Sequence, residues 1–349
     1  MIRGASPRVV VLSCNRIAEG CQQTTCNTLC RLSISKHHRD RKPCFGVKSA
    51  KPIYVEIAIG GSLDEIWRLT QTPELHARWD LRFTEISYLP RPSVDEPQRF
   101  LYATRIGGGF KIEGRGETIG VRTSDTGERA SSLKFWSDDH KSLINEGSGY
   151  WKYIPVSDGV RFLTLYDYRV RFGMLGELAD RFVFRPAMGW ATAWSFDRLR
   201  LWAESGIPPE AAMRSAAVYV LSRSSVAFVW FWHGLVPKLL FRHPDEAIML
   251  TDAGVSAINA RLGVSIAGMV EIAMAIWVLL AWRSLFPMVV TILLMLAALV
   301  GVAVLSPRMI AMPFNPITLN LLVVGLAAVA CVSRRFTPSA SRCRRKRAS

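Results

Sequence analysis

Ionisable side chains lie in the apolar second half of the chain, where they could carry proton chemistry. Glu271 lies eight residues into the apolar run 263–282. His233 lies inside the earlier run 216–236, and Lys238 follows that run in the loop after it. A charged group near the centre of a membrane span costs about 2.5 to 3.5 kcal/mol on insertion scales, so it needs a partner or a purpose. A His233–Glu271 pair would hold a proton beside a polar pocket or a quinone head group.

Arg223 is a different candidate partner for Glu271, and this pair would have a structural role. Arg223 lies eight residues beyond Ser215, and Glu271 eight residues beyond Gly263, so each is about 12 Å from one end of its span. The two depths agree within about 6 Å. We therefore favour a structural Arg223–Glu271 pair that fixes the helix register, and keep the proton-handling pair as the alternative.

These charges belong to runs that are long enough to cross a membrane. About 20 helical residues cover the hydrocarbon core, which predicts four transmembrane helices. Seven basic residues and no acidic residue follow the last run, which places the basic tail 334–349 in the cytoplasm. With four spans, the segment before Ser215 is cytoplasmic too, in a multi-pass protein of the inner (plasma) membrane. The four spans are 216–236, 263–282, 286–305 and 317–332.

The charge distribution argues against a nucleic-acid partner. The 349 residues include 44 Lys and Arg against 28 Asp and Glu, for a formal net charge of +16, and 50% of them are hydrophobic. Most of the excess lies in the two ends, with +7 in residues 1–50 and +7 in residues 334–349. A folded nucleic-acid-binding domain would carry the basic patch on its own surface, whereas the middle of this chain is nearly neutral.

The segment before the membrane half shows the periods of an α+β domain. Ile53, Val55, Ile57 and Ile59 alternate with other residues, as in a half-buried strand, and Ser62 then provides a helix N-cap. Alternating segments between 84 and 172 predict an antiparallel meander, followed by a long helix over 176–204 with a break near Pro186. A sheet curved around a C-terminal helix leaves a cavity between them.

Five aromatic residues on the inner faces of the predicted strands are candidates to line that cavity. An aromatic stripe is more often plain core, but tyrosine hydroxyls need polar partners that a pocket supplies. The five candidates are Phe135, Trp151, Tyr153, Tyr166 and Tyr168.

No arrangement for catalysis or metal binding emerges from the sequence. The six histidines form no metal-binding spacing, and no nucleophile motif is present, so we expect no catalytic residues, no metal and no evident cofactor other than a quinone. Residues 1–50 form a basic, Cys-rich extension without periodicity, which we expect to be disordered or to precede a translation start near Val47. Its cysteines are Cys14, Cys21, Cys26, Cys30 and Cys44.

The segment 51–205 opens with IYVEIAIGGSLDEIWRLTQTPELHARW and closes with GWATAWSFDRLRLW. With the order of elements above, these two stretches resemble the SRPBCC superfamily, the START-like helix-grip domains that bind hydrophobic ligands. A linker at 206–213 leads to the segment 214–333, which contains Gly234, Pro237, Lys238 and Glu271 among its four spans. These residues and the order of the spans resemble the DoxX-like family of small four-helix membrane proteins. This resemblance implies an all-α transmembrane bundle, in a family named after a subunit associated with thiosulfate and quinone oxidation.

These observations lead to two functional hypotheses. The first is a membrane-tethered binding protein, rather than an enzyme, whose cytoplasmic START-like domain holds a lipid, isoprenoid or quinone next to the bilayer. From Glu204 to Ala216 the chain spans at most about 40 Å, which keeps the cavity close to the membrane. The alternative is a membrane component of a quinone-linked oxidoreductase. The expected partners are the lipid bilayer and an apolar small molecule, with a redox partner or a homo-oligomer under the alternative.

Overall fold

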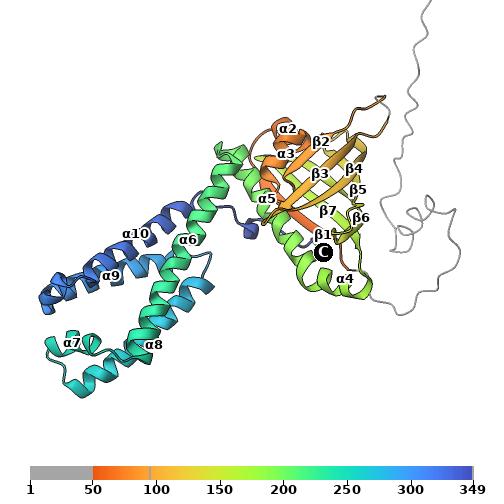
Figure 1. Ribbon diagram of the computed structural model, residues 1–349. Helices are drawn as coiled ribbons and strands as arrows, with labels where there is room; N and C mark the ends of the chain where they lie inside the picture. Colours follow the sequence, from red (N-terminus) through yellow and green to blue (C-terminus); the bar gives the residue numbers. More distant parts are fainter. Residues whose placement is uncertain (1–49, 94–95, 348–349) are drawn as a thin grey trace, which may run out of the picture. The chain divides into compact units, whose positions relative to one another are not determined.

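The computed structural model describes residues 50–93 and 96–347 (Figure 1). The predicted disordered extension, with its five cysteines, lies outside the described residues.

The N-terminal part contains one seven-stranded antiparallel sheet, as the alternating segments predict. The strand order is β1-β7-β6-β5-β4-β3-β2, so strands β2 to β7 form a meander and β1 pairs with the last of them. Strand β1 is therefore an edge of the sheet. The strands are β1 (Ile53–Ile59), β2 (Glu85–Tyr88), β3 (Arg99–Ile106), β4 (Phe110–Thr123), β5 (Arg129–Trp136), β6 (Ile144–Val156) and β7 (Gly159–Val170).

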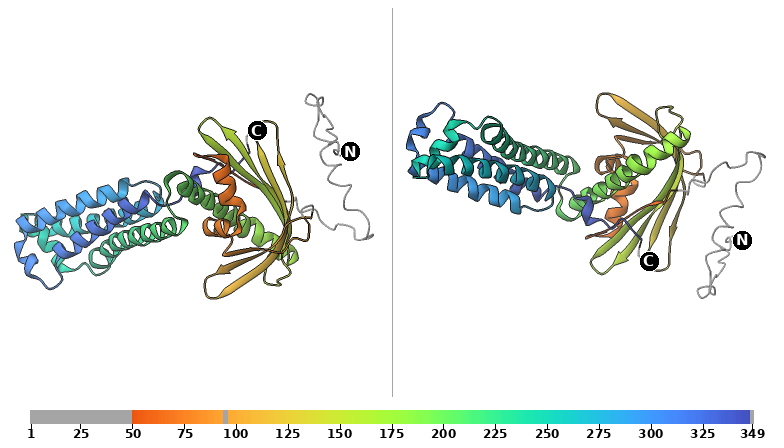
Figure 2. Two further views of the ribbon diagram at one scale, coloured as in Figure 1. Left: turned by 90° about the horizontal axis from the view of Figure 1, so that it is seen from above. Right: turned by 90° about the horizontal axis from the view of Figure 1, so that it is seen from below.

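Helices cover the inner face of this sheet. Helix α2 (Leu63–Gln71) begins as predicted at Ser62, whose hydroxyl accepts a hydrogen bond from the Glu65 amide at 3.2 Å, and α3 (Pro73–Trp79) follows. The long helix α5 (Arg185–Ser205) lies across the concave side of the sheet (Figure 2). Residues from β1, β7 and α5 form the core, and the predicted helix-grip arrangement is confirmed.

The predicted break near Pro186 is also present. A short helix α4 (Gly173–Ala179) passes into a π-helical turn, Asp180–Phe184, before α5 begins. Pro186 lies in the first turn of α5, directly after this π-helical turn, where the regular α-helical hydrogen bonding is already interrupted.

Glycines make room for aromatic rings on the inner face of the sheet. A side chain at Gly114 would collide with the ring of Tyr102, and one at Gly116 would collide with the ring of Phe100. Both pairs join directly opposed positions of β3 and β4. The rings can therefore lie over the neighbouring strand instead of standing upright, which leaves free volume above the sheet.

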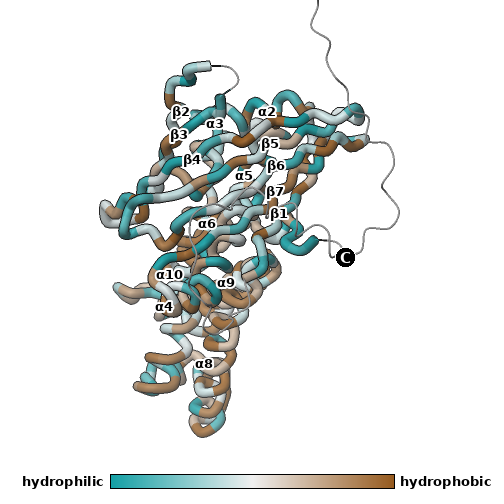
Figure 3. The backbone as a smooth tube through the Cα atoms, turned by 90° about the vertical axis from the view of Figure 1, so that its right-hand side faces the viewer, coloured by the Kyte–Doolittle hydropathy of each residue, from teal (hydrophilic) through white to brown (hydrophobic). Residues whose placement is uncertain are grey.

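The C-terminal part consists mainly of apolar helices (Figure 3). Three of them are long and apolar enough to cross a membrane. Helix α6 with its π-helical extension is followed by α7 after a bend of 93°, and these two segments form a fourth span if they are counted together. The elements are α6 (Pro209–His233), the π-helical segment Gly234–Leu240, α7 (Pro244–Asp252), α8 (Ala257–Leu280), α9 (Phe286–Leu305) and α10 (Pro316–Arg334).

The basic tail after α10 folds back onto the sheet domain. The Ser339 amide donates to the Asp197 carboxylate at 2.7 Å, and Arg344 and Glu56 exchange two backbone hydrogen bonds of 2.8 and 2.9 Å. Arg344 thereby covers part of the exposed edge of β1, and Cys343 is buried beside Ala193. Since the tail and the sheet domain touch, they lie on the same side of the membrane, which requires an even number of spans and supports four.

Candidate functional site

A cavity of about 470 Å³ lies between the inner face of the sheet and helix α5. Three of the five predicted aromatic residues line it, namely Phe135, Trp151 and Tyr166. The rings of Phe100 and Tyr102, placed over Gly116 and Gly114, line it as well. Its volume is within the range of about 300 to 1,000 Å³ that is typical of small-molecule sites.

The other two predicted residues are not among those that line this cavity. Tyr153 is fully buried, and its hydroxyl lies 2.7 Å from Thr70 Oγ1 and accepts a hydrogen bond from Gln71 Nε2 at 2.9 Å. Tyr168 donates to Asp180 at 2.7 Å. Burial raises the pKa of both phenols, so they remain neutral hydrogen-bonding groups of the core.

A polar cluster that the sequence analysis did not single out forms one part of the cavity wall. His76 in α3 and Arg82 in the following loop both line the cavity, and both bind the fully buried carboxylate of Asp80. His76 Nε2 lies 3.1 Å from Asp80 Oδ2, and Arg82 donates from Nε and Nη2 at 2.9 and 2.6 Å. The sequence contained one indication of this cluster. His76 and Asp80 are four residues apart in a helical segment, and residues with this spacing lie on one face of a helix.

The cluster is held in fixed charge states. Burial alone would raise the pKa of Asp80, but Arg82 and His76 outweigh that effect and hold it well below its ordinary value. For His76, burial outweighs the attraction of Asp80 and lowers the pKa. At neutral pH the cluster therefore contains an ionised Asp80–Arg82 pair and a neutral imidazole, which packs against the rings of Trp79 and Trp151.

This charge state predicts acid sensitivity. Because the folded pKa of His76 is lowered, its contribution to stability is present above the ordinary histidine value of about 6.5 and is lost as the pH falls below it. We expect the free energy of unfolding of the full chain to fall between pH 7 and pH 5, by up to about 1.4 kcal/mol per pH unit. His76→Gln should flatten this slope in thermal unfolding. His140→Gln, at a side chain that is 91% exposed, should leave the slope unchanged.

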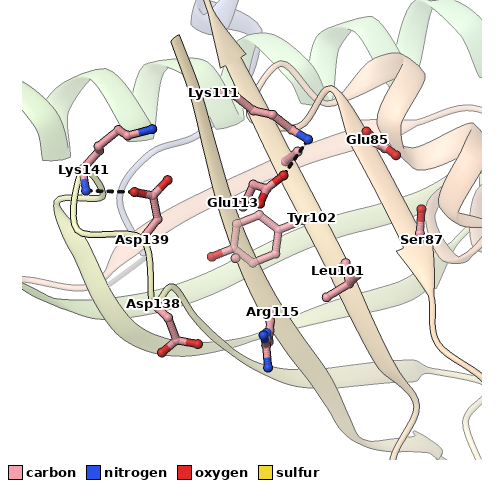
Figure 4. Close-up of a pocket in the computed structure, with 12 residues that line it drawn as sticks. Glu85, Ser87, Leu101, Tyr102, Lys111, Glu113, Arg115, Asp138, Asp139 and Lys141 are labelled. Carbon is pink, nitrogen blue, oxygen red and sulfur yellow. Dashed lines mark hydrogen bonds and ion pairs between the residues drawn. The ribbon is translucent and has the colours of Figure 1, made fainter.

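A second pocket, of about 510 Å³, lies on the outer face of strands β2 to β4 (Figure 4). It is lined by charged groups that pair locally, such as Lys111 with Glu113 at 2.6 Å. The Asp139 carboxylate accepts a hydrogen bond from the Lys141 amide at 3.0 Å. Tyr102, whose ring lies over Gly114, and Lys141 are near both pockets. Strand alternation thus gives the sheet a charged outer face and a more apolar inner one.

In the membrane part, Arg223 does not pair with Glu271, so the favoured prediction is wrong. Arg223 is completely buried and donates to the carbonyl oxygens of Val278, Ala281 and Ser284 at 2.7 to 2.9 Å. Val278 and Ala281 lie at the C-terminal end of α8 and Ser284 lies in the turn before α9, so the guanidinium caps that helix end and ties it to the turn. Glu271 lies seven residues before Val278, about 10 Å away along the axis.

Glu271 instead meets Lys238, on the π-helical segment. Lys238 Nζ lies 3.2 Å from Glu271 and 3.1 Å from Glu246 of α7, so one ammonium serves two carboxylates. The contact with Glu271 is an ion pair without hydrogen-bond geometry, since Glu271 Oε2 has no hydrogen-bond partner among the described residues.

Close packing of two glycines brings this cluster together. A side chain at Gly234 would lie 2.6 Å from the Gly268 carbonyl, and one at Gly268 would lie 3.0 Å from Lys238 Cβ. The helices approach closely because neither residue has a side chain. His233 comes just before this contact, but no hydrogen bond or ion pair joins it to Glu271 in the described part of the chain.

Comparison with known proteins agrees with this architecture. Residues 227–328 match the DoxX-like family. The uncharacterized membrane protein YndG of Bacillus subtilis is 51% identical over 185 residues, which are 53% of this chain and 69% of that protein. The chain belongs to the DoxX-like family. This DoxX-like protein is therefore a membrane protein with a helix-grip domain in front of its apolar helices.

Solved structures similar to this DoxX-like protein cover its N-terminal part. A STAR-related lipid transfer protein from Xanthomonas axonopodis is 15% identical, with a TM-score of 0.33, over 44% of this chain and 94% of that one. Human StAR-related lipid transfer protein 5 is 13% identical, with a TM-score of 0.32, over 44% of this chain and 84% of that one.

Proposed function

We propose that this DoxX-like protein binds an apolar molecule of the lipid, isoprenoid or quinone type in the cavity of its helix-grip domain. The observation that carries the proposal is the cavity of about 470 Å³ lined by aromatic rings from several strands and by Met188 and Ala191 of α5. Helix α5 ends at Ser205, and α6 begins at Pro209, so three residues separate the cavity helix from the first membrane helix. A ligand would thus be exchanged close to the bilayer.

The test is mass spectrometry of the full-length protein, purified from membranes and washed extensively. An apolar molecule should be recovered in stoichiometric amount from the parent chain. Ala191→Trp fills the cavity from α5 and should abolish its recovery. Ser205→Trp places the same side chain on the exposed end of the same helix and should leave recovery unchanged. Equal recovery from both variants would show that the molecule is bound elsewhere, against the proposal.

We also propose that the sheet domain and the tail face the cytoplasm. The support is the basic tail, since positive residues next to membrane spans stay on the cytoplasmic side. Ala253, between α7 and α8, would then lie outside. Ala253→Cys should react with a membrane-impermeant maleimide in intact cells, and Asp125→Cys, in the sheet domain, should react only after lysis. The reverse pattern, measured against the parent chain, would overturn this orientation.

The Lys238–Glu246–Glu271 cluster favours a second candidate, a quinone-linked redox component of the membrane. Two carboxylates beside one ammonium leave a net charge of −1, which a proton would neutralise. In membranes, Glu271→Gln should abolish quinone-dependent activity under this candidate. An activity that survives Glu271→Gln would remove the candidate.

A further inference from the structure

The cavity wall has an uneven charge. Arg82 and Lys141 line it, together with His76, whereas none of the described residues that line it is an aspartate or glutamate. Asp80, the carboxylate that balances Arg82, is completely buried behind the wall. A ligand in the cavity therefore lies next to positively charged hydrogen-bond donors of the wall and next to no ionised acceptor.

Asp80 fixes the orientation of the Arg82 guanidinium. It accepts hydrogen bonds from Nε and Nη2 of the side chain and, at 3.1 Å, from the Arg82 backbone amide. The guanidinium also lies over the Tyr166 ring, with 5.3 Å from its carbon to the ring centroid. Two of its five N–H donors are committed to Asp80, which leaves three for Tyr166 and for an acceptor in the cavity. An arginine held in this way loses little entropy when it binds an acceptor.

Lys141 adds a second positive group. It follows Asp139 in the loop between β5 and β6, and its ammonium end points away from the Asp138 and Asp139 carboxylates (Figure 4). Its Nζ lies 5.6 Å from the centroid of the Phe110 ring. No ion pair with a carboxylate is found for Lys141 in the described part of the chain, so this charge remains available to an incoming anion.

We propose that the cavity selects an apolar molecule with a single anionic head group, and that Arg82 binds this head group. This inference rests on the proposed ligand binding and names its chemical class: a fatty acid, an acidic isoprenoid or another chain ending in a carboxylate or phosphate. A neutral molecule would cover the guanidinium and supply at most an uncharged acceptor, which does not fully repay the desolvation free energy of the charge. An anion replaces the lost water with charge-assisted hydrogen bonds.

The test measures the equilibrium binding of two probes to the full-length protein in amphipol. The probes are oleate and oleyl alcohol, which have the same hydrocarbon chain and differ in their head group. The parent chain should bind oleate about 10- to 100-fold more tightly, the range expected for a hydrogen bond to a charged group. Arg82→Gln should reduce this ratio to about threefold or less. Lys111→Gln, which removes a lysine from the outer face of the sheet, should leave the ratio unchanged.

The variant Arg82→Gln leaves Asp80 buried without its partner, so the double variant D80N/R82Q is the second measurement. It removes both charges, and it too should lose the preference for oleate. Equal binding of both probes by the parent protein would contradict the preference for an anionic head group, but it would not contradict the proposed ligand binding. A preference that survives in D80N/R82Q would overturn the role of Arg82. Binding of neither probe, with an empty cavity by mass spectrometry, would overturn the proposed function itself.

Discussion

Replacing Lys238 with Met should prevent stable folding of the membrane part. The substitution leaves Glu246 and Glu271 facing each other without the ammonium that lies 3.1 and 3.2 Å from them. Removing one partner of a buried ion pair costs about 3 to 5 kcal/mol, which is a large share of a typical stability of about 5 to 15 kcal/mol. The measurement is the yield of monodisperse protein in detergent, together with its thermal unfolding midpoint.

Two further variants separate charge from packing at this cluster. Lys238→Arg keeps the positive charge and should retain most of the yield. The double variant K238M/E271Q removes the ion pair from both sides and should recover part of the stability lost in Lys238→Met. If Lys238→Met were as stable as the parent chain, the cluster would not contribute to folding.

Replacing Arg223 with Leu should destabilise the turn between α8 and α9. The substitution removes the guanidinium that binds the carbonyl oxygens of Val278, Ala281 and Ser284, of which the Val278 contact is fully buried. A hydrogen bond to a charged group contributes about 1.5 to 3 kcal/mol, so a total loss of roughly 3 kcal/mol or more is expected. The thermal unfolding midpoint in detergent measures it.

Double-variant cycles distinguish this capping role from an ion pair. Arg223→Leu and Glu271→Gln should be additive within about 0.5 kcal/mol, since the two residues share no contact. Arg223→Leu and Tyr219→Phe should be coupled, because Arg223 Nη1 donates to the Tyr219 hydroxyl at 2.7 Å. Strong coupling between Arg223 and Glu271 would instead restore the pairing that the sequence suggested.

The local elements could be read from the sequence because each depends on neighbouring residues. The alternation at Ile53 to Ile59 predicted β1, the Ser62 cap predicted the start of α2, and the apolar runs predicted the membrane helices. The distribution of basic residues likewise separated the charged ends from a nearly neutral middle. These patterns arise from strand and helix periods, which tertiary contacts change little.

The pairing of charges in the membrane could not be predicted in the same way. A depth calculation placed Arg223 and Glu271 together because it assumed a helix beginning near Ser215. Helix α6 begins at Pro209 and continues into a π-helical segment, and the Gly234–Gly268 contact sets its register against α8. An ion pair between two helices depends on this register, and the depth of each residue within its own span does not contain that information.

The cavity also combines features that the sequence determines with features that only the tertiary structure determines. The sequence alone determined that aromatic residues would face inward from a curved sheet, since strand alternation decides which face a side chain takes. Only the tertiary structure decided that Trp151 and Tyr166 line a cavity while Tyr153 is held in the core by Thr70 and Gln71. It also brought Arg82 to the cavity wall, with its charge balanced by Asp80 from behind. The physical reason is that free volume and charge pairing depend on distances between segments remote in sequence, whereas strand and helix periods are local.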